Sequence, residues 1–311
     1  MSPDPVSSHP TAIAGPEPER ERSRPGVPSP GRRGSRFNIG DALHDGMTAF
    51  SKAPLGFGVF AALLTGLQVL LLPLQERLLV EPSGRPQPVD LLLFLLGVSL
   101  SLAVSLWGSQ GMVRGAWAAL EGQRPSLLSL LRWEGKGFAR LLSAWTLLGL
   151  LLLIPLLVLL AAVVIALLLL AGPAGGGNQQ QTLMLFATAL LGFVGLAAVG
   201  AFGLLINYLG VNQQFLAQIA LLEGRSGLAT LRRGRRLVDP QWLLLLLLLL
   251  IKGLLLVLGG LLAFITMGIA WILAWPLVSC ITTAAYRQLL ELQPEAAPEQ
   301  LNPSGASRRW W

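Results

Sequence analysis

The chain has 311 residues, 53% of them hydrophobic and only 13% charged, whereas about 25% of the residues in soluble domains are charged. This composition excludes an ordinary soluble protein and indicates an integral membrane protein. The net charge of +7 could suggest a nucleic-acid partner. However, the basic residues cluster between apolar runs and no DNA-binding motif occurs, so nucleic acid is excluded and anionic lipid headgroups are the expected partners.

The N-terminal region divides into a tail and a short helix. Residues 1–36 are rich in proline and arginine and poor in apolar side chains, so we predict a disordered tail. Apolar residues then recur at three- and four-residue steps within residues 37–52, at Phe37, Ile39, Leu43, Met47 and Phe50. This spacing predicts an amphipathic helix that lies in the headgroup plane before the first membrane span.

Apolar runs that are long enough for membrane spans follow. A helix needs about 20 residues to cross a hydrocarbon core of ~30 Å, and the runs cover residues 54–74, 90–112, 141–171, 182–210 and 241–286. The last run is long enough for two helices, with Gly259, Gly260 and Gly268 as places to turn. We therefore predict an all-α transmembrane bundle of about six helices within residues 53–292, followed by a disordered tail at 293–311.

The basic residues predict the orientation of these spans. Lysine and arginine are retained on the cytoplasmic side of membrane proteins, and 20 of the 23 in this chain lie in the N-terminal segment, the second and fourth connections and the C-terminal segment. If the connections alternate between sides, these four segments share one side. We expect a multi-pass protein of the bacterial inner membrane with both termini in the cytoplasm.

The second and fourth connections contain an internal repeat. "LEGQRPSLLSLLR" and "LEGRSGLATLRRGRR" share Leu-Glu-Gly, then arginine, then a leucine-rich stretch that ends in arginine, and "TAAYRQLLEL" is a looser third copy. Their basic residues either anchor the topology as a solvated face or bind lipid headgroups or a partner protein. The candidates for contact with headgroups or a partner are Arg124, Arg132, Arg225, Arg232, Arg233, Arg235 and Arg236.

Lys252 is the charged residue that lies deepest within a predicted span. It follows Trp242, the expected interface residue, by ten positions, which places it roughly 15 Å along the helix and near the middle of the bilayer. Its side chain either extends to water or faces a polar cavity that holds an anionic ligand. Polar groups of the fourth span could line that cavity, although hydrogen bonding between helices would also explain them: Asn207, Tyr208, Asn212, Gln213, Gln214 and Gln218.

A stripe of small residues runs along the second span. Gly97, Ser101, Ser105 and Ser109 repeat every four residues and so share one helix face. Such a stripe favours close packing against another helix over the lining of a pore, since hydroxyl groups without charge give little selectivity.

Residues for catalysis are scarce. The chain has one cysteine, Cys280, and two histidines, His9 and His44, so we expect neither a metal site, a cofactor nor a catalytic triad. The acidic residues all lie outside the apolar spans, which also argues against a buried pair of carboxylates. We therefore expect a protein that is not an enzyme.

Three stretches of the sequence carry a family resemblance. "RGAWAALEGQRPSLLSLL", "IALLEGRSGLATLRRGRRLVDPQWLLLLLLLL" and "WPLVSCITTAAYRQLL" resemble a group of six-helix bacterial membrane proteins. The group includes the membrane domain attached to some glycerophosphoryl diester phosphodiesterases, and the likeness covers residues 37–292. It implies a helical bundle with an amphipathic entry helix. It implies no activity, because the phosphodiesterase chemistry of the fused proteins resides in a separate soluble domain.

The sequence thus predicts a membrane protein without catalytic machinery that binds or organises membrane lipids or partner proteins through a basic cytoplasmic rim. One alternative is a transporter or permease for a small anionic or amphipathic solute, with its site near Lys252. It lacks an acidic residue for coupling beside that lysine. The other alternative is a membrane anchor or assembly factor.

Overall fold

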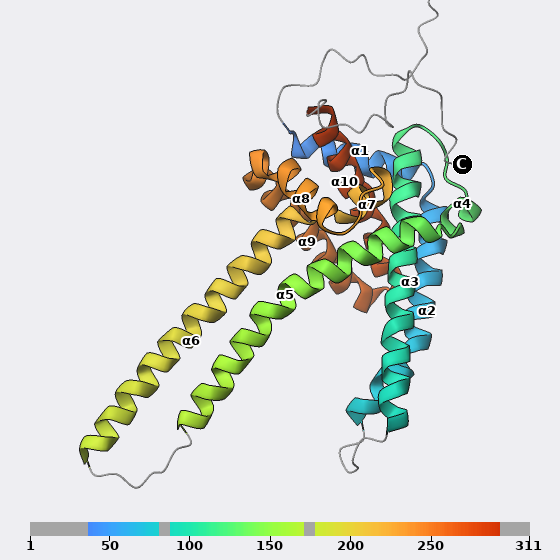
Figure 1. Cartoon of the computed structure of the whole chain (residues 1–311). Helices are drawn as coiled ribbons and strands as arrows, with labels where there is room; N and C mark the ends of the chain where they lie inside the picture. The colour runs from blue at the N-terminus through green and yellow to red at the C-terminus, as the bar shows by residue number, and fades with distance from the viewer. Residues whose placement is uncertain (1–36, 81–87, 171–177, 293–311) are drawn as a thin grey trace, which may run out of the picture. The chain divides into compact units, whose positions relative to one another are not determined.

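The structure, a computed structural model, describes residues 37–80, 88–170 and 178–292 (Figure 1). The tails predicted to be disordered, 1–36 and 293–311, lie outside the described residues. So does the glycine-rich connection at 171–177. All elements among the described residues are helical, which confirms the predicted all-α class.

Six helices among the described residues are long and apolar enough to cross a membrane, so the chain is a multi-pass membrane protein. This confirms the predicted number of spans. The six are α2 (Pro54–Val80), α3 (Pro88–Leu120), α5 (Gly135–Leu170), α6 (Asn178–Asn212), α9 (Trp242–Ile265) and α10 (Ile269–Leu292). Successive long helices pair as hairpins, because α2 packs on α3, α5 on α6, and α9 on α10.

The short helices gather with one set of ends of the long helices (Figure 1). They are α1 (Ile39–Ser51), α4 (Leu127–Leu131), α7 (Leu216–Leu222) and α8 (Gly227–Val238), and a single 3-10 turn, η1 (Asp239–Gln241), joins α8 to α9. We call these elements, together with the helix ends that they contact, the head. The largest buried side chains that pack there include Tyr286, Phe57, Phe60 and Phe215.

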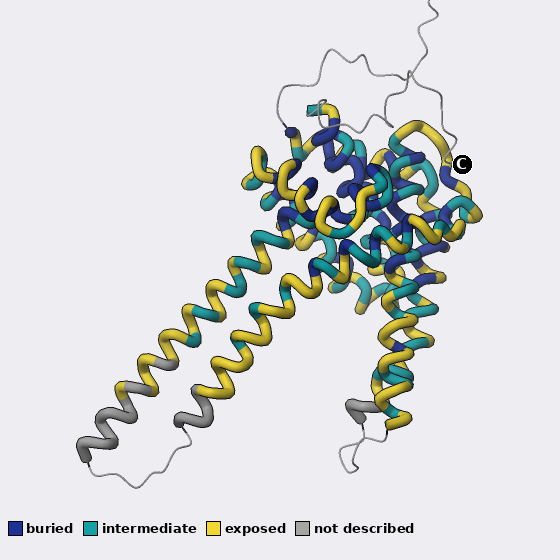
Figure 2. Tube along the Cα trace, in the orientation of Figure 1, coloured by how far each residue is buried: buried dark blue, intermediate teal, exposed yellow. Residues whose placement is uncertain are grey.

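Burial differs sharply between the head and the long hairpins (Figure 2). In the most apolar window of α10, 44% of the residues are buried, whereas the corresponding share is 6% for α5 and 0% for the span that contains α6. The apolar side chains of α5 and α6 therefore face outward over most of their length. In a membrane these side chains contact lipid.

Helix α1 is where it was predicted, and the predicted apolar residues Ile39, Leu43 and Phe50 pack against the core, but its most deeply buried face was not predicted. The buried face consists of small residues, Ala42, Gly46 and Ala49. A Cβ added to Gly46 would lie 2.5 Å from Ile281 Cα, so the backbones of α1 and α10 are in close contact there. Met47, predicted to be on the apolar side, is 52% exposed. The sequence pattern missed this face because it counted large apolar residues, whereas close helix contact requires small ones.

The stripe of small residues on α3 packs against α2, as predicted. A Cβ at Gly97 would lie 2.9 Å from the Leu74 Cβ. Gln68 of α2 donates from Nε2 to the Ser101 carbonyl and to the Ser105 hydroxyl, each at 2.9 Å. The stripe therefore joins two helices by close contact and hydrogen bonds.

The final apolar region turns between α9 and α10. Met267 and Gly268 adopt positive φ angles of 50° and 93°, and the Gly268 amide donates to the Ala263 carbonyl at 2.8 Å. This bond is the helix-ending pattern in which a left-handed residue terminates the helix. Gly268 is thus at the turn, as predicted. Gly259, in contrast, lies within α9, where a Cβ would be 2.7 Å from the Ala274 Cβ of α10.

Candidate functional site

Three of the four arginines of α8 lie on the exposed side of an amphipathic helix. The buried positions are Thr230, Leu231, Arg233, Gly234, Leu237 and Val238. The exposed positions include Arg232, Arg235 and Arg236, which we call the α8 arginines. Because the two sets alternate at three- and four-residue steps, the apolar side holds α8 against the head while the α8 arginines face outward. Arg235 pairs with Asp239 on this exposed surface, with 3.3 Å between Nε and Oδ2.

The second connection also exposes basic side chains. Arg124 and Arg132 are both exposed, as predicted for a basic rim. The backbone beside Arg132 is held in place, because its carbonyl accepts a hydrogen bond from the Arg114 guanidinium. Arg114 Nη1 also lies 3.9 Å from Glu134 Oε2. The segment between α4 and α5 is therefore tied to α3.

The two connections fold alike at the start of the repeat. In both, a helix ends at the leucine of Leu-Glu-Gly, the glycine adopts a positive φ (89° at Gly122, 68° at Gly224), and a serine precedes the next helix. These serines are Ser126 before α4 and Ser226 before α8. The structure thus supports the repeat for these two copies. The third suggested copy, at 283–292, lies inside α10 and has no such turn among the described residues.

Arg233 belongs to a buried ion network rather than to the exposed rim. The Glu223 carboxylate, whose side chain has no exposed surface, accepts from Arg233 Nε at 3.0 and 3.1 Å. It also accepts from Arg225 Nε at 2.8 Å and from the Tyr286 hydroxyl at 2.7 Å. The predicted contact between Arg233 and a headgroup or partner is therefore wrong, since its helix position turns it into the head. Arg225 remains 43% exposed at the edge of this network.

Lys252 is enclosed within the bundle. Its residue is 6% exposed, and its ammonium donates to Gln214 Oε1 at 2.9 Å and to the Thr282 hydroxyl at 3.3 Å. The alternative in which this side chain extends to water is therefore wrong for this structure. Both acceptors are neutral, and Gln214 lies in the three-residue interruption at 213–215 between α6 and α7. The lysine thus links α9 to that interruption and to α10.

The other predicted cavity residues do not surround Lys252. Asn207 is exposed and donates to the Gly203 carbonyl one turn earlier in α6, at 3.0 Å. Gln213 donates to the Leu231 carbonyl of α8 at 3.4 Å. Asn212 is buried, and neither side-chain polar atom has a hydrogen-bond partner among the described residues. Asn207 and Gln213 therefore serve separate contacts, and Lys252 donates to Gln214 and Thr282 instead of to any of these three amides.

Metal ligands do not cluster within the described ranges. No group of three or more histidine, cysteine, aspartate or glutamate residues there could hold a metal ion. Cys280 is buried with a free thiol. The polar chemistry of the described residues thus centres on Glu223, on Lys252 and on the exposed arginines.

Comparison with known proteins finds no match for this chain, whether among protein-family models, curated proteins or solved structures. The resemblance to the six-helix bacterial group is not tested by these comparisons and stays a prediction.

Sequence reasoning placed Gln214 among the possible cavity residues near Lys252 but missed Thr282 and the partners of Glu223. The acidic residues were all assigned to positions outside the apolar core, yet Glu223 is buried. A signal was available, because the Glu223 segment carries arginine two residues later and again ten residues later. Thr282 offered no comparable signal, since threonine is common in membrane helices and its distance from Lys252 depends on how α9 and α10 pack.

Proposed function

We propose that this protein binds the anionic headgroups of membrane phospholipids through the α8 arginines together with Arg124 and Arg132, and so organises lipids around the head. The observation that carries the proposal is the division of α8. Its apolar side is buried in the head, and three arginines on the opposite side are exposed. Because the apolar side of α8 is occupied by the head, the attraction to lipid would come from its exposed arginines, which are favoured near an anionic membrane surface.

The distribution of charge supports a location for this surface. The basic connections and both terminal segments would share the cytoplasmic side of a bacterial inner membrane, where the leaflet surface is negative. A lysine or arginine near such a surface contributes ~1 kcal/mol to binding. The exposed arginines would therefore hold anionic lipids next to the head without catalytic residues or a cofactor.

A transporter is the second candidate, and Lys252 is the observation that favours it. An ammonium whose hydrogen-bond acceptors, Gln214 and Thr282, are both neutral leaves a positive charge inside an apolar bundle. An anionic solute could supply the missing negative charge, and interrupted helices are where transporters bind substrates. In favour of a purely structural role, two of the three ammonium donors already have acceptors.

Lipid binding by purified protein tests the proposal. The wild-type protein and the triple variant Arg232→Gln/Arg235→Gln/Arg236→Gln would be titrated with phosphatidylglycerol or phosphatidylcholine in detergent and examined by native mass spectrometry. We expect the wild type to prefer phosphatidylglycerol and the triple variant to bind it about tenfold or more weakly, because three attractive charges are lost.

Two further variants serve as controls. Asn207→Ala removes an exposed polar side chain of α6 and should bind lipid as the wild type does. Lys252→Leu tests the transporter, since it should retain lipid but lose a co-purified anionic solute if the second candidate is correct. If the triple variant keeps the wild-type preference for phosphatidylglycerol, the proposed function is wrong. A stoichiometric protein that co-purifies with every variant would favour an anchor or assembly factor instead.

A further inference from the structure

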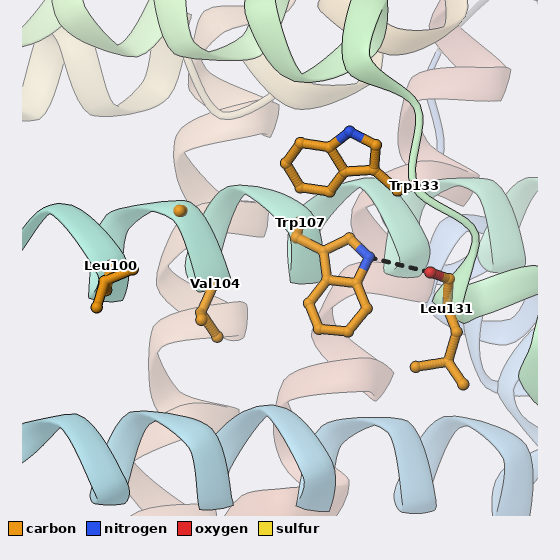
Figure 3. Close-up of a pocket in the computed structure, with 6 residues that line it drawn as sticks. Leu100, Val104, Trp107, Leu131 and Trp133 are labelled. Carbon is orange, nitrogen blue, oxygen red and sulfur yellow. Dashed lines mark hydrogen bonds between the residues drawn. The ribbon is translucent and has the colours of Figure 1, made fainter.

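An apolar groove lies along α3 next to the segment that joins α4 to α5 (Figure 3). We call it the α3 groove. It has a volume of about 330 Å³ and is lined by Leu100, Ala103, Val104, Trp107, Leu131 and Trp133. It lies outside the contacts of Lys252 and of Glu223 described above, and its walls come from two segments that the sequence separates by more than twenty residues.

Both indole walls of the α3 groove are held in place. Trp107 donates from Nε1 to the Leu131 carbonyl at 3.2 Å, the bond drawn in Figure 3, and its ring meets Phe60 edge-on with 6.0 Å between centroids. Trp133 packs on Phe138 with 4.7 Å between ring centroids. Between the indoles and Leu100, the small side chain of Ala103 leaves space along the helix. The groove is thus formed by the fold itself and does not need a ligand to shape it.

The α3 groove lies along a membrane-spanning helix. Four of its lining residues belong to the α3 membrane span. From Trp107 to Leu100 the groove follows seven helix positions, which is about 10 Å toward the middle of the span. In a membrane, the open side of this apolar groove meets lipid chains rather than water.

Exposed cations follow the groove-lining residues of the second connection in the chain. Arg132 is exposed, and it sits between the lining residues Leu131 and Trp133 in the chain. Lys136, which is also exposed, follows four residues later in the first turn of α5. Trp133 is itself 54% exposed, and tryptophan at such a position is typical of the boundary between lipid chains and headgroups. An apolar groove with an exposed cation next to its lining residues in the chain matches an amphipathic anion.

We propose that the α3 groove binds one phospholipid, with an acyl chain along Leu100, Ala103 and Val104 and the phosphate at Arg132. This inference rests on the proposed function and deepens it by assigning one headgroup contact to a specific lipid site. A phospholipid fits both halves of the site, because its chain requires an apolar wall and its phosphate requires a cation. A membrane helix of a partner protein would use the apolar wall but would not require Arg132.

Three variants test this site: one fills the α3 groove, one removes part of its wall, and one removes the neighbouring positive charge. Ala103→Phe places a ring in the groove, Trp133→Ala removes one wall, and Arg132→Gln removes the charge. Leu102→Phe is the matched control, since Leu102 is a neighbour on α3 that is 45% exposed and does not line the groove. The probe is phosphatidylglycerol, compared with phosphatidylcholine, bound to the intact protein in detergent and counted by native mass spectrometry.

We expect one tightly bound phosphatidylglycerol in the wild type and in Leu102→Phe. Ala103→Phe and Trp133→Ala should each weaken it about tenfold, the change expected when roughly two methylene groups lose apolar contact. In Arg132→Gln the one tightly bound lipid should no longer be preferentially phosphatidylglycerol, whereas weaker binding at the α8 arginines should keep its preference. If Ala103→Phe does not fold, Trp133→Ala and Arg132→Gln decide the question.

Three other outcomes would contradict the proposed lipid site. If the groove variants bind the lipid as the wild type does while the α8 triple variant loses it, the site is wrong and the proposed function stands. If neither set changes phosphatidylglycerol binding, both proposals fail. If Ala103→Phe displaces a co-purified membrane protein and leaves the lipid count unchanged, the groove binds a partner helix and the lipid site is again wrong.

Discussion

Glu223 connects three elements of the head at the scale of single residues. It follows α7 directly, receives Arg233 of α8 and the Tyr286 hydroxyl of α10, and its own side chain has no exposed surface. A buried carboxylate of this kind stabilises the fold only while its partners remain, because each partner was removed from water to reach it. The network therefore determines where α8 lies, and with it the direction in which the α8 arginines point.

Replacing Glu223 should destabilise the protein strongly. Glu223→Gln keeps the size of the side chain but leaves the Arg233 charge buried without its counter-charge, so the free energy of unfolding should fall by ~3 kcal/mol or more. The repeat offers a matched control. Glu121, at the same place in Leu-Glu-Gly, is exposed and accepts a hydrogen bond from Trp117 Nε1 at 2.7 Å.

The measurement is thermal unfolding in detergent, followed by tryptophan fluorescence. Glu121→Gln should change the free energy of unfolding by no more than ~0.5 kcal/mol, as expected of an exposed site. Equal losses in the two variants would show that burial of Glu223 does not carry the stability assigned to it.

At the scale of elements, helix ends are stabilised by side chains from other helices. The last two backbone carbonyls of α3 accept hydrogen bonds from other elements. Lys52 Nζ donates to the Ala119 carbonyl at 2.7 Å, and Arg287 Nη1 donates to the Leu120 carbonyl at 2.9 Å. Cations at the C-terminus of a helix stabilise it, because the free carbonyls there are partially negative. Two of the basic residues counted in the charge pattern therefore hold α3 to its neighbours instead of facing lipid.

A glycine of α1 allows the backbones of α1 and α10 to approach closely. Gly46→Ala would place a Cβ 2.5 Å from the Ile281 backbone, so α1 must move away. We expect the free energy of unfolding to fall by ~1–3 kcal/mol, the usual effect of overpacking. Gly66→Ala is the control, since no atom lies within 4 Å of the added Cβ in α2. It should be neutral or stabilise the helix by up to about 1 kcal/mol. Thermal unfolding of both variants measures the difference.

Helices were easier to predict from the sequence than the contacts between them. The six spans and α1 follow from long apolar runs and from a three- to four-residue period, and both signals are local in the chain. The pairing of Lys252 with Thr282 depends on how two helices are rotated against each other, which composition does not encode. The same reason hid Arg233, whose place on the buried face of α8 was masked by four neighbouring arginines.

For the whole molecule, the proposed orientation makes a prediction of its own. Cys280 is the single cysteine and is buried, so Cys280→Ala gives a background for single-cysteine labelling. Gln123→Cys, in the exposed second connection, should react with a membrane-impermeant maleimide only after the cells are opened. Ala174→Cys, in the third connection without basic residues, should react in intact cells. The reverse pattern would invert the proposed topology, and labelling of both positions from one side would contradict the count of spans between them.

Because the α5 and α6 hairpin is long, its tilt in the membrane depends on the thickness of the bilayer. Helix α5 has 36 residues, which is about 54 Å of helix, while the hydrocarbon core measures ~30 Å. A helix this long and apolar must tilt, or the bilayer around it must thicken, to keep its side chains out of water. Bilayer thickness therefore sets the tilt of this hairpin, and a thicker membrane would accommodate it with less distortion than a thin one.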